Sequence, residues 1–409
     1  MTVIIVLLLS TLAQAHAEDR SCVQLRTYHD FYHCSVIKHP AFSAAKLKVQ
    51  EGEAVFEKSA QLKNPEVEVK SVSGENAGER IGSTELSLSI PLSQIWVNGA
   101  EREAARAEQR IAEIESKESL MKVKKEVLRD IYRFRQIEAE LHLVIEAIES
   151  FEKIEKQFKG RRVRGPEQEI TLNLVELAVG DYELKKNHLT TERAEILSRL
   201  KAIWGPKEEI RKEFLPPLKD KWPSVDSETN VSASFEVQRL VAESDRATAE
   251  EKIAARESLP ELKAGPVAER TTEGPNQYWS YGFNVSMSVP LLSFNGGSRR
   301  LAETKAAQAR FMSDYAQKKS QLERDILIQK YKSAVDSLKK SSSRNELTKK
   351  HAKIDSLFRQ GLAAGALVIE AHRQITEFTE SQHEHEMLAL DSYVELMALS
   401  GKEIEEILK

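Results

Sequence analysis

The stretch at 87–92 reads Ser-Leu-Ser-Ile-Pro-Leu, and 286–291 reads Ser-Met-Ser-Val-Pro-Leu. In both, apolar and small polar side chains alternate with period two as far as a proline, which is typical of a β-strand that ends there. The alternation extends upstream through Leu86 in the first copy and through Tyr281, Phe283 and Val285 in the second. This recurrence predicts a duplicated fold that contains strands with one apolar and one polar face.

Other stretches of the chain match in the same order, at an offset of about 200 residues. Asn64–Val69 parallels Leu259–Ala264, Val97–Gly99 parallels Phe294–Gly296, Phe158 falls opposite Phe358, and Leu200–Gly205 falls opposite Leu396–Gly401. Each repeat is interpreted as a helix, two strands, a very long helix, a turn and a further helix.

Two long stretches contain neither glycine nor proline, Ala100–Lys159 and Ser298–Gln360. At ~1.5 Å per residue each predicts a single helix about 90 Å long. The first carries apolar residues at alternating spacings of three and four, interrupted by Glu155, which favours coiled-coil packing. These residues are Phe134, Ile137, Leu141, Val144, Ile148, Phe151 and Phe158.

The composition excludes several classes of protein. Of the 409 residues, 30 % are charged and 6 % aromatic, which is typical of long helices with a narrow apolar seam. The net charge of −4 argues against a nucleic-acid partner. The mean hydropathy is −0.45, and beyond the N-terminus no apolar run approaches the ~18 residues of a membrane-spanning helix, so a polytopic helical membrane protein is excluded. A transmembrane β-barrel stays open, because its strands alternate.

Residues 1–17 are interpreted as a signal peptide, because the apolar block Val3–Leu9 is followed by small residues up to Ala17. The residues before Cys22 do not form the small, apolar run expected before a lipid-modified cysteine, so an exported, unlipidated protein is expected.

Cys22 and Cys34 are the only two cysteines. In an oxidising compartment they could close a short disulfide loop worth about 3 kcal/mol in the chain-entropy model, and two idle thiols fit equally. With His29 and His33 nearby, a metal site is a further, less favoured alternative.

The alternating strands suggest a membrane location. Four strands cannot cover a soluble core of this size, but several chains can close a barrel with apolar residues toward lipid and polar residues toward a wet lumen. The segments Ser73–Ser83 and Arg270–Trp279 are predicted to be outer loops, because they are polar and contain glycine. Strand–helix junctions are expected at Pro91, Gly99, Pro290 and Gly297.

From about residue 41 to 401 the chain resembles the TolC-like outer membrane efflux family. The resemblance rests on the duplication, on Val-Pro-Leu-Leu-Ser-Phe-Asn-Gly-Gly-Ser-Arg at 289–299, and on Phe-Arg-Gln-Gly at 358–361 followed by Ile369–Ala371. The opening Asn64–Val67 is similar to the heavy-metal (CzcC-like) efflux branch.

The resemblance implies a mainly α fold with a transmembrane β part, in which long coiled-coil hairpins form a periplasmic tunnel. It implies a homotrimer with a 12-stranded outer-membrane barrel, docked to a periplasmic adaptor protein and an inner-membrane pump. The protein would then be a passive conduit of a tripartite efflux or type I secretion system, located in the bacterial outer membrane and extending into the periplasm. The expected divisions are 1–17 signal peptide, 18–40 N-terminal segment, 41–205 first repeat, 206–228 equatorial linker, 229–401 second repeat and 402–409 tail.

The candidate site is the tunnel mouth. The resemblance implies that Glu370 lines the entrance, together with Leu367 where an Asp is common. The turns expected to dock the adaptor contain Gly361 and Gly365 in one hairpin, and Arg162 and Gly165 in the other. Capping chemistry alone also explains the glycines, and the basic turn also fits a solvated charge run.

His383-Glu384-His385 is interpreted as an exposed polar face rather than a metal site, because helical residues two apart point in different directions. No catalytic, cofactor-binding or metal-ligating residue is expected, and no cofactor, since no common catalytic or nucleotide-binding motif occurs. The alternatives are a periplasmic coiled-coil adaptor, which would carry one hairpin, and a structural scaffold, which would not need the strands.

Overall fold

The structure is a computed structural model that describes Cys22, residues 25–404 and Ile407, with internal gaps. The gaps are residues 77–78, 161, 163–164, 206–209, 220, 226–230, 289–294, 342–343 and 361–362. The chain divides into two compact units, each built from both repeats. Unit 1 contains residues 1–44, 118–231 and 321–409, and unit 2 contains residues 45–117 and 232–320. The segment expected to be a signal peptide lies outside the described residues.

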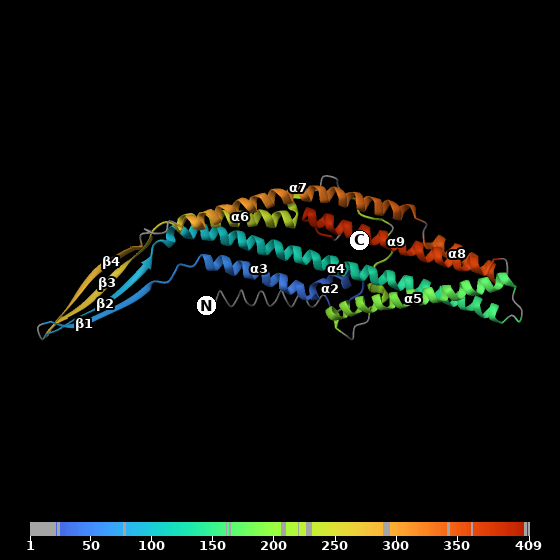
Figure 1. Ribbon diagram of the computed structural model, residues 1–409, viewed down its shortest axis with the longest axis horizontal. Coiled ribbons are helices and arrows are strands. Elements are labelled where there is room, and N and C mark those ends of the chain that lie inside the picture. Colours follow the sequence, from blue (N-terminus) through green and yellow to red (C-terminus); the bar gives the residue numbers. More distant parts are fainter. Residues whose placement is uncertain are drawn as a thin grey trace. The chain divides into compact units, whose positions relative to one another are not determined.

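The elements follow the predicted duplication (Figure 1). After α2 (Tyr28–Lys38), the first repeat contains α3 (Pro40–Ser59), β1 (Glu66–Asn76), β2 (Glu79–Pro91), α4 (Gln94–Lys159) and α5 (Pro166–Trp204). Two short 3-10 helices follow, η1 (Lys212–Phe214) and η2 (Val231–Ala233). The second repeat contains α6 (Phe235–Arg256), β3 (Glu261–Glu273), β4 (Asn276–Ser288), α7 (Gly296–Lys340), α8 (Arg344–Arg359) and α9 (Gly365–Ser400). The mainly helical fold with four strands is therefore confirmed.

The four strands of unit 2 form one antiparallel sheet in the order β1-β2-β3-β4 (Figure 1). Ser87 pairs with Glu68 on one side and with Val267 on the other, so the two repeats meet at the β2–β3 ladder. The prediction of outer loops at 73–83 and 270–279 is wrong for most of these residues, because 73–76, 79–83, 270–273 and 276–279 belong to the strands. β3 and β4 are joined by Gly274 and Pro275 alone, and Gly274 has the positive φ of 53° that a tight turn requires.

The β2–β3 ladder contains one close backbone approach, at Gly265. A Cβ added to Gly265 would lie 1.7 Å from the carbonyl oxygen of Leu88, so no other residue fits without displacing the strand. The next residue is Pro266, which cannot donate a ladder hydrogen bond, and the residue pairing of β2 with β3 is interrupted at this point. Gly265 therefore allows the backbone of β3 to approach the backbone of β2 at Leu88 more closely than a residue with a side chain would.

The helix α4 ends at Lys159, directly before Gly160, as the sequence predicts. It begins earlier than expected, at Gln94, so Gly99 lies inside the helix and the expectation of a junction there is wrong. Pro91 does end β2, and Gly297 is the second residue of α7, whereas Pro290 lies outside the described residues.

The second long helix is not continuous. α7 ends at Lys340 and α8 begins at Arg344, so the prediction of one helix over 298–360 is wrong. The sequence at the break is Ser-Ser-Ser, and the Ser341 hydroxyl donates to the carbonyl oxygen of Leu338 at 2.7 Å. Serine side chains compete for backbone hydrogen bonds in this way and weaken helix interiors.

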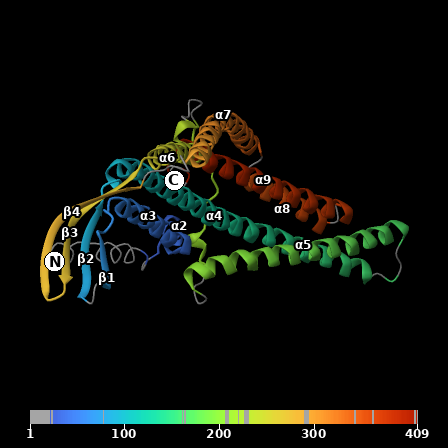
Figure 2. The same ribbon diagram turned by 60° about the vertical axis from the view of Figure 1, so that its left-hand side comes forward.

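The core of unit 1 is the predicted seam of α4, which packs against α5 (Figure 2). On α5 the buried side chains lie seven residues apart, at Val175, Tyr182, Leu189 and Ile196. On α4 the seam passes through Ile154 rather than through the predicted position of Glu155. Ile154 lies three residues after Phe151 and four before Phe158, so the three-four spacing of the seam continues through it.

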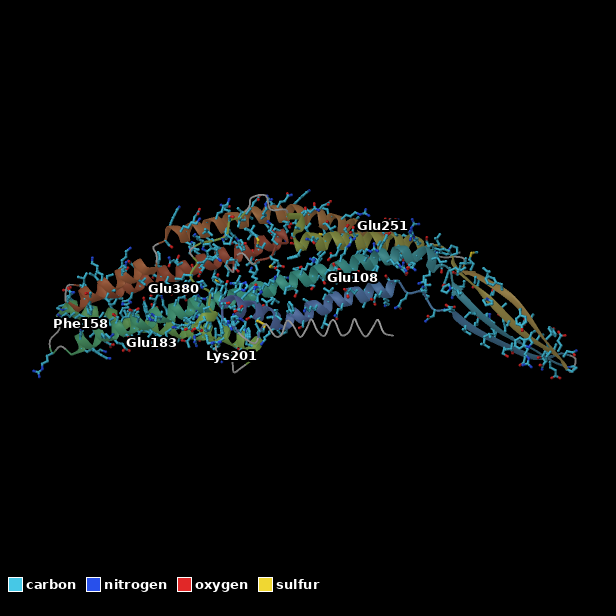
Figure 3. The ribbon with its side chains drawn as sticks, turned by 180° about the vertical axis from the view of Figure 1, so that it is seen from behind. Glu108, Phe158, Glu183, Lys201, Glu251 and Glu380 are labelled. Carbon is cyan, nitrogen blue, oxygen red and sulfur yellow. A yellow bond between two sulfur atoms is a disulfide. The ribbon has the colours of Figure 1, made fainter. Side chains whose placement is uncertain are left out.

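The helices of unit 2 carry ion pairs around a small apolar cluster. Ile111, Ile114 and Ala242 form this cluster. Arg246 of α6 binds Glu108 of α4 at 2.5 Å, and Arg310 of α7 binds Glu251 of α6 at 3.3 Å (Figure 3). Among the described residues, no helix combines the length and the hydropathy that crossing a membrane requires.

The N-terminal segment packs against the other elements of unit 1. A disulfide joins Cys22 to Cys34, in α2. Phe31 stacks on both Trp204 and Phe214, each at 5.1 Å between ring centroids, and the Trp204 indole N–H donates to Ser35 Oγ at 2.7 Å. The buried face of α2 therefore packs on the end of α5 and on η1.

We predict that Gly265→Ala lowers the free energy of unfolding by about 3 kcal/mol, the upper end of the usual cost of overpacking. The reason is the clash of the new methyl group with the Leu88 carbonyl. The matched control is Gly74→Ala in β1, where nothing lies within 4 Å of the added methyl group. Thermal unfolding followed by circular dichroism measures both variants, and equal midpoints would contradict the close approach.

Candidate functional site

The sheet of unit 2 exposes large apolar side chains on one face. Their positions alternate along each strand, and cross-strand pairs such as Val69 with Leu86 bring them together. The exposed members are Val67, Val69, Leu86, Leu88, Ile90, Trp279, Tyr281, Phe283, Val285 and Met287. At ~3.4 Å per residue, the stretch of β4 from Trp279 to Met287 extends about 27 Å, close to the ~25 Å apolar band of transmembrane barrels.

Aromatic rings gather at one edge of this band. Trp279 and Tyr281 stack with 6.4 Å between ring centroids and an interplanar angle of 10°. Both remain exposed, at 59 % and 80 %. An aromatic girdle at the edge of an apolar band is typical of proteins at a membrane–water interface.

The opposite face of the sheet is mostly polar, although it also exposes Val72 and Tyr278. Glu85 lies between Lys70 of β1 and Glu269 of β3, and Lys263 binds Glu66 at 2.8 Å. On β4 this face carries Ser286, Asn284, Gly282 and Ser280. The sheet therefore separates an apolar surface from a charged one.

The ends of the two hairpins meet in unit 1. The first residue of α9, Gly365, is buried, and a Cβ there would lie 3.2 Å from Thr171 Cγ2 of α5 and 3.3 Å from Ile154 Cγ2 of α4. Phe158, next to the first turn, is also close, at 3.6 Å (Figure 3). The expectation that Gly365 leaves room for an adaptor is therefore wrong, because the chain's own helices occupy that space.

The other predicted docking residues differ in accessibility. Arg162 is exposed, and Gly165 forms the N-cap of α5 with nothing within 4 Å of an added Cβ. Gly361 lies outside the described residues. Among the predicted docking residues that the structure describes, Arg162 and Gly165 are therefore accessible and Gly365 is not.

The predicted entrance residues lie on the first turns of α9. Leu367 is 60 % exposed. Glu370 accepts hydrogen bonds from Arg373 at 2.7 Å and from Gln374 at 2.8 Å, and these lower its pKa to about 2. Arg373 also binds Glu377 at 2.6 Å, so the three side chains carry one net negative charge. Glu370 is therefore an ionised but largely compensated carboxylate.

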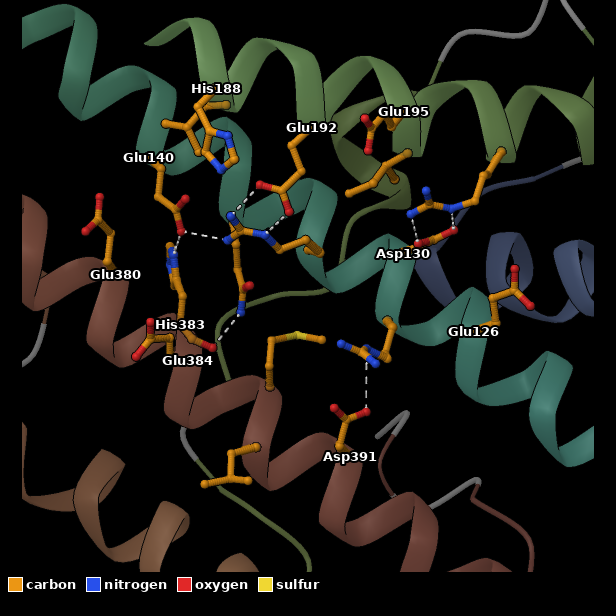
Figure 4. Close-up of a pocket in the computed structure, with 18 of the residues that line it drawn as sticks. Glu126, Asp130, Glu140, His188, Glu192, Glu195, Glu380, His383, Glu384 and Asp391 are labelled. Carbon is orange, nitrogen blue, oxygen red and sulfur yellow. Dashed lines mark hydrogen bonds and ion pairs between the residues drawn. The ribbon is translucent and has the colours of Figure 1, made fainter. Parts of the chain in front are cut away.

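A groove of about 1300 Å³ in unit 1 was not predicted. It is lined by α4, α5 and α9, and charged side chains dominate its walls (Figure 4). Arg199 binds Asp130 through two hydrogen bonds of 2.6 and 2.9 Å. Arg133 similarly binds both carboxylate oxygens of Glu192 at 2.7 Å.

Glu140 is the centre of the buried charges in this groove. It lies 2.9 Å from Arg133 and 2.5 Å from His383 Nδ1, which joins α4 to α9. Burial alone would raise its pKa, but the hydrogen bonds from His383 and Arg133 lower it overall. His383 is buried, so the expectation of an exposed polar face at 383–385 is wrong for this residue. Its partner is 243 positions away, which local periodicity does not indicate.

Glu380 lies three residues before His383 (Figure 4), and its pKa is shifted in the direction opposite to that of Glu140. Burial raises its pKa, and the nearby charges of Glu140, Glu377 and Glu384 raise it further against the effect of Lys185. Lys185 lies 3.9 Å away. The described residues contain no group of three or more His, Cys, Asp or Glu side chains arranged to hold a metal ion.

Comparison with solved structures identifies the fold. The outer membrane protein VceC from Vibrio cholerae matches with a TM-score of 0.68 over 92 % of this chain and 96 % of that chain, at 11 % identity. The chain has the fold of the outer-membrane channels. The open state of the MtrE outer membrane channel from Neisseria gonorrhoeae matches with a TM-score of 0.73 at 10 % identity, over 92 % and 89 % of the two chains.

A third channel has the same fold. The CmeC outer membrane channel from Campylobacter jejuni matches with a TM-score of 0.67 at 13 % identity, over 91 % of this chain and 85 % of that chain. No protein-family model and no curated protein sequence matches the chain. The chain thus has the outer-membrane channel fold at 10–13 % sequence identity, which is too low to assign the roles of individual residues from these structures.

We predict opposite effects for two glutamates of the groove. Glu140→Gln removes a carboxylate from Arg133 and His383, and lowers the free energy of unfolding at pH 7 by roughly 3 kcal/mol. Because the folded-state pKa of Glu140 is lowered, its contribution exists above the ordinary carboxyl pKa and is lost as the pH falls through the lowered value.

Glu380→Gln is expected to stabilise the protein at pH 7. Its raised pKa means that the folded state binds the proton more tightly, so the ionised wild type loses stability as the pH rises through the raised value. Urea unfolding at a series of pH values measures both variants. The same sign for the two at pH 7 would contradict the electrostatics of the groove.

We further predict that Gly365→Leu destabilises the packing of α9 on α4 and α5 by about 1–3 kcal/mol. The control is Ala366→Leu, since Ala366 is exposed in the same helical turn and its change should stay within about 0.5 kcal/mol. Denaturant unfolding compares them. Two equally stable variants would show that Gly365 has open space beside it.

Proposed function

We propose that this chain is the outer-membrane channel of a tripartite efflux or type I secretion system. One observation carries the proposal: a four-stranded sheet with a continuous exposed apolar face, a charged opposite face, and strands that lead into helices as long as α4. The apolar face suits lipid and the charged face suits a wet lumen, which is the division a membrane barrel requires. The outer-membrane channel fold supports the same conclusion.

The sheet needs further copies to close. β1 and β4 each have one neighbour in the sheet, so their outer edges present free backbone groups, which hydrocarbon does not tolerate. A homotrimer supplies twelve strands and removes every edge. Its helices then continue the barrel as a tunnel into the periplasm, and solutes pass along it without chemical change.

The tunnel mouth is assigned to the end of unit 1 that contains the interhelical turns. Arg162 and Gly165 offer an accessible surface for the tip of a periplasmic adaptor, and the adaptor links the channel to an inner-membrane pump. Glu370 and Leu367 are assigned to the lumen at the entrance. Arg373 compensates Glu370, so a ring of three such carboxylates would attract cations only moderately.

The divisions of the chain follow the repeats. Residues 1–17 are the signal peptide, 18–40 an N-terminal segment, 41–205 and 229–401 the two efflux repeats, 206–228 the linker and 402–409 the tail. The resemblance at Asn64–Val67 supports the heavy-metal efflux branch, whereas the pump selects the exported solute. An adaptor would contain one hairpin, whereas α4–α5 and α8–α9 form two.

Two neighbouring residues of β4 test this function. Val285 lies on the apolar face and Ser286 on the polar face, and both are exposed. Val285→Arg places a charge against lipid, at a cost of roughly 2–4 kcal/mol near the bilayer midplane. We expect it to reduce the heat-modifiable trimer in the outer-membrane fraction, while Ser286→Arg still assembles.

The conductance of planar bilayers that contain the purified protein provides the functional measurement. Wild type and Ser286→Arg should form pores, with a different conductance in the variant because the new charge faces the lumen. A wild-type protein recovered as a soluble periplasmic monomer without conductance would refute the channel. Equal assembly of the two variants would refute the assignment of the faces.

A further inference from the structure

Two histidines of α2 lie side by side. The Nε2 atoms of His29 and His33 are 3.1 Å apart, and the two rings are 4.3 Å apart between centroids. The residues are separated by four positions and therefore share one face of the helix. His29 is exposed and His33 is half-buried, so the pair lies at the surface of unit 1.

The packing of α2 fixes the direction of this pair. Phe31, Tyr32, Cys34 and Ser35 are buried, and they hold the opposite side of the helix against unit 1. Phe31 stacks between Trp204 and Phe214, and the disulfide from Cys34 to Cys22 restrains the same helix. The rotation of α2 is therefore set by contacts that do not involve His29.

The first turn of α2 is fixed independently. Thr27 and Asp30 form a capping box, in which the Asp30 backbone N–H donates to Thr27 Oγ1 at 3.2 Å and the Thr27 N–H donates to Asp30 Oδ2 at 3.0 Å. His29 lies within this turn. The second histidine, His33, packs edge-on against the ring of Tyr32, with 5.3 Å between the ring centroids. Both imidazoles thus stand on an ordered backbone before any ligand arrives.

We propose that His29 and His33 bind a divalent transition-metal ion, Cu²⁺ above all. A metal–nitrogen bond is ~2.0–2.1 Å long, so two imidazoles on one ion have their nitrogens about 2.9–3.4 Å apart, for angles from 90° to tetrahedral. The observed 3.1 Å lies in this range. The i, i+4 spacing is also that of the two helical histidines in zinc proteases.

The site has two protein ligands, and water completes the coordination. Asp30 points its carboxylate at the backbone and at the Thr27 hydroxyl, so it is committed to the cap. Imidazole ligands suit Cu²⁺, Ni²⁺ and Zn²⁺, and the general order of affinity places Cu²⁺ highest. An ion held in this way joins two successive turns of α2 and stabilises the folded N-terminal segment, because the unfolded chain lacks the site.

The experiment is a calorimetric titration of the full chain, purified without a histidine tag, with Cu²⁺ alone in a non-chelating buffer. The variants are His29→Ala and His33→Ala. The control is His142→Ala, an exposed histidine of α4 with Glu138 and Glu146 at the positions four residues away. We expect each α2 variant to lose at least about tenfold in affinity for this site, the minimum for a lost ligand when even outer-shell changes cost 10–100-fold. The control should retain the wild-type affinity.

Electron paramagnetic resonance separates chelation by the pair from other copper binding. The wild type should show coupling to two imidazole nitrogens, and each α2 variant should lose this pattern. Circular dichroism verifies that the variants fold, which is expected because His29 is exposed. Absence of Cu²⁺ binding to the wild type, or binding that survives both substitutions unchanged, would overturn the proposal without affecting the channel function.

Discussion

The structure of unit 1 depends on a narrow line of apolar side chains between α4 and α5. Val175, Tyr182, Leu189 and Ile196 recur every seven residues on α5 and meet the line on α4 that includes Phe151. Helices of this length have no globular core to bury, so this seam supplies most of their hydrophobic stabilisation. Val368 of α9 joins the same cluster, which fixes where the second hairpin meets the first.

The charges beside the seam follow from its narrowness. Because the apolar line covers only part of each helix, α4, α5 and α9 bring charged residues together in the groove, where they must pair to be tolerated. Arg133 and Glu140, about two turns apart on α4, do so together with His383 of α9. Unit 2 likewise has little apolar core. Every residue of β4 is exposed, on both faces of the sheet.

The features set by local spacing could be predicted from the sequence. Period-two alternation gave the strands, and the end of α4 coincides with the glycine at 160. The predictions that failed concern features that depend on residues distant in sequence, or on side chains that compete for backbone hydrogen bonds. The neighbours of Gly365 come from α4 and α5, and the partner of His383 lies on α4, so neither pattern contains the information. The break after Lys340 comes where the Ser341 hydroxyl donates to the carbonyl oxygen of Leu338, and a count of apolar residues does not record such a hydrogen bond.

The pairing of β2 with β3 has a consequence for the order in which the chain folds. The β1–β2 and β3–β4 pairings join neighbours in sequence and close short loops, whereas β2 and β3 are separated by the whole of α4, α5 and α6. Closing such a loop costs entropy that no local contact repays, so non-local strand pairing is slow. The two β-hairpins can therefore form early, whereas β2 can pair with β3 near Gly265 only after the second repeat has been synthesised. A chain that ended before β3 would leave the edge of β2 without a partner strand.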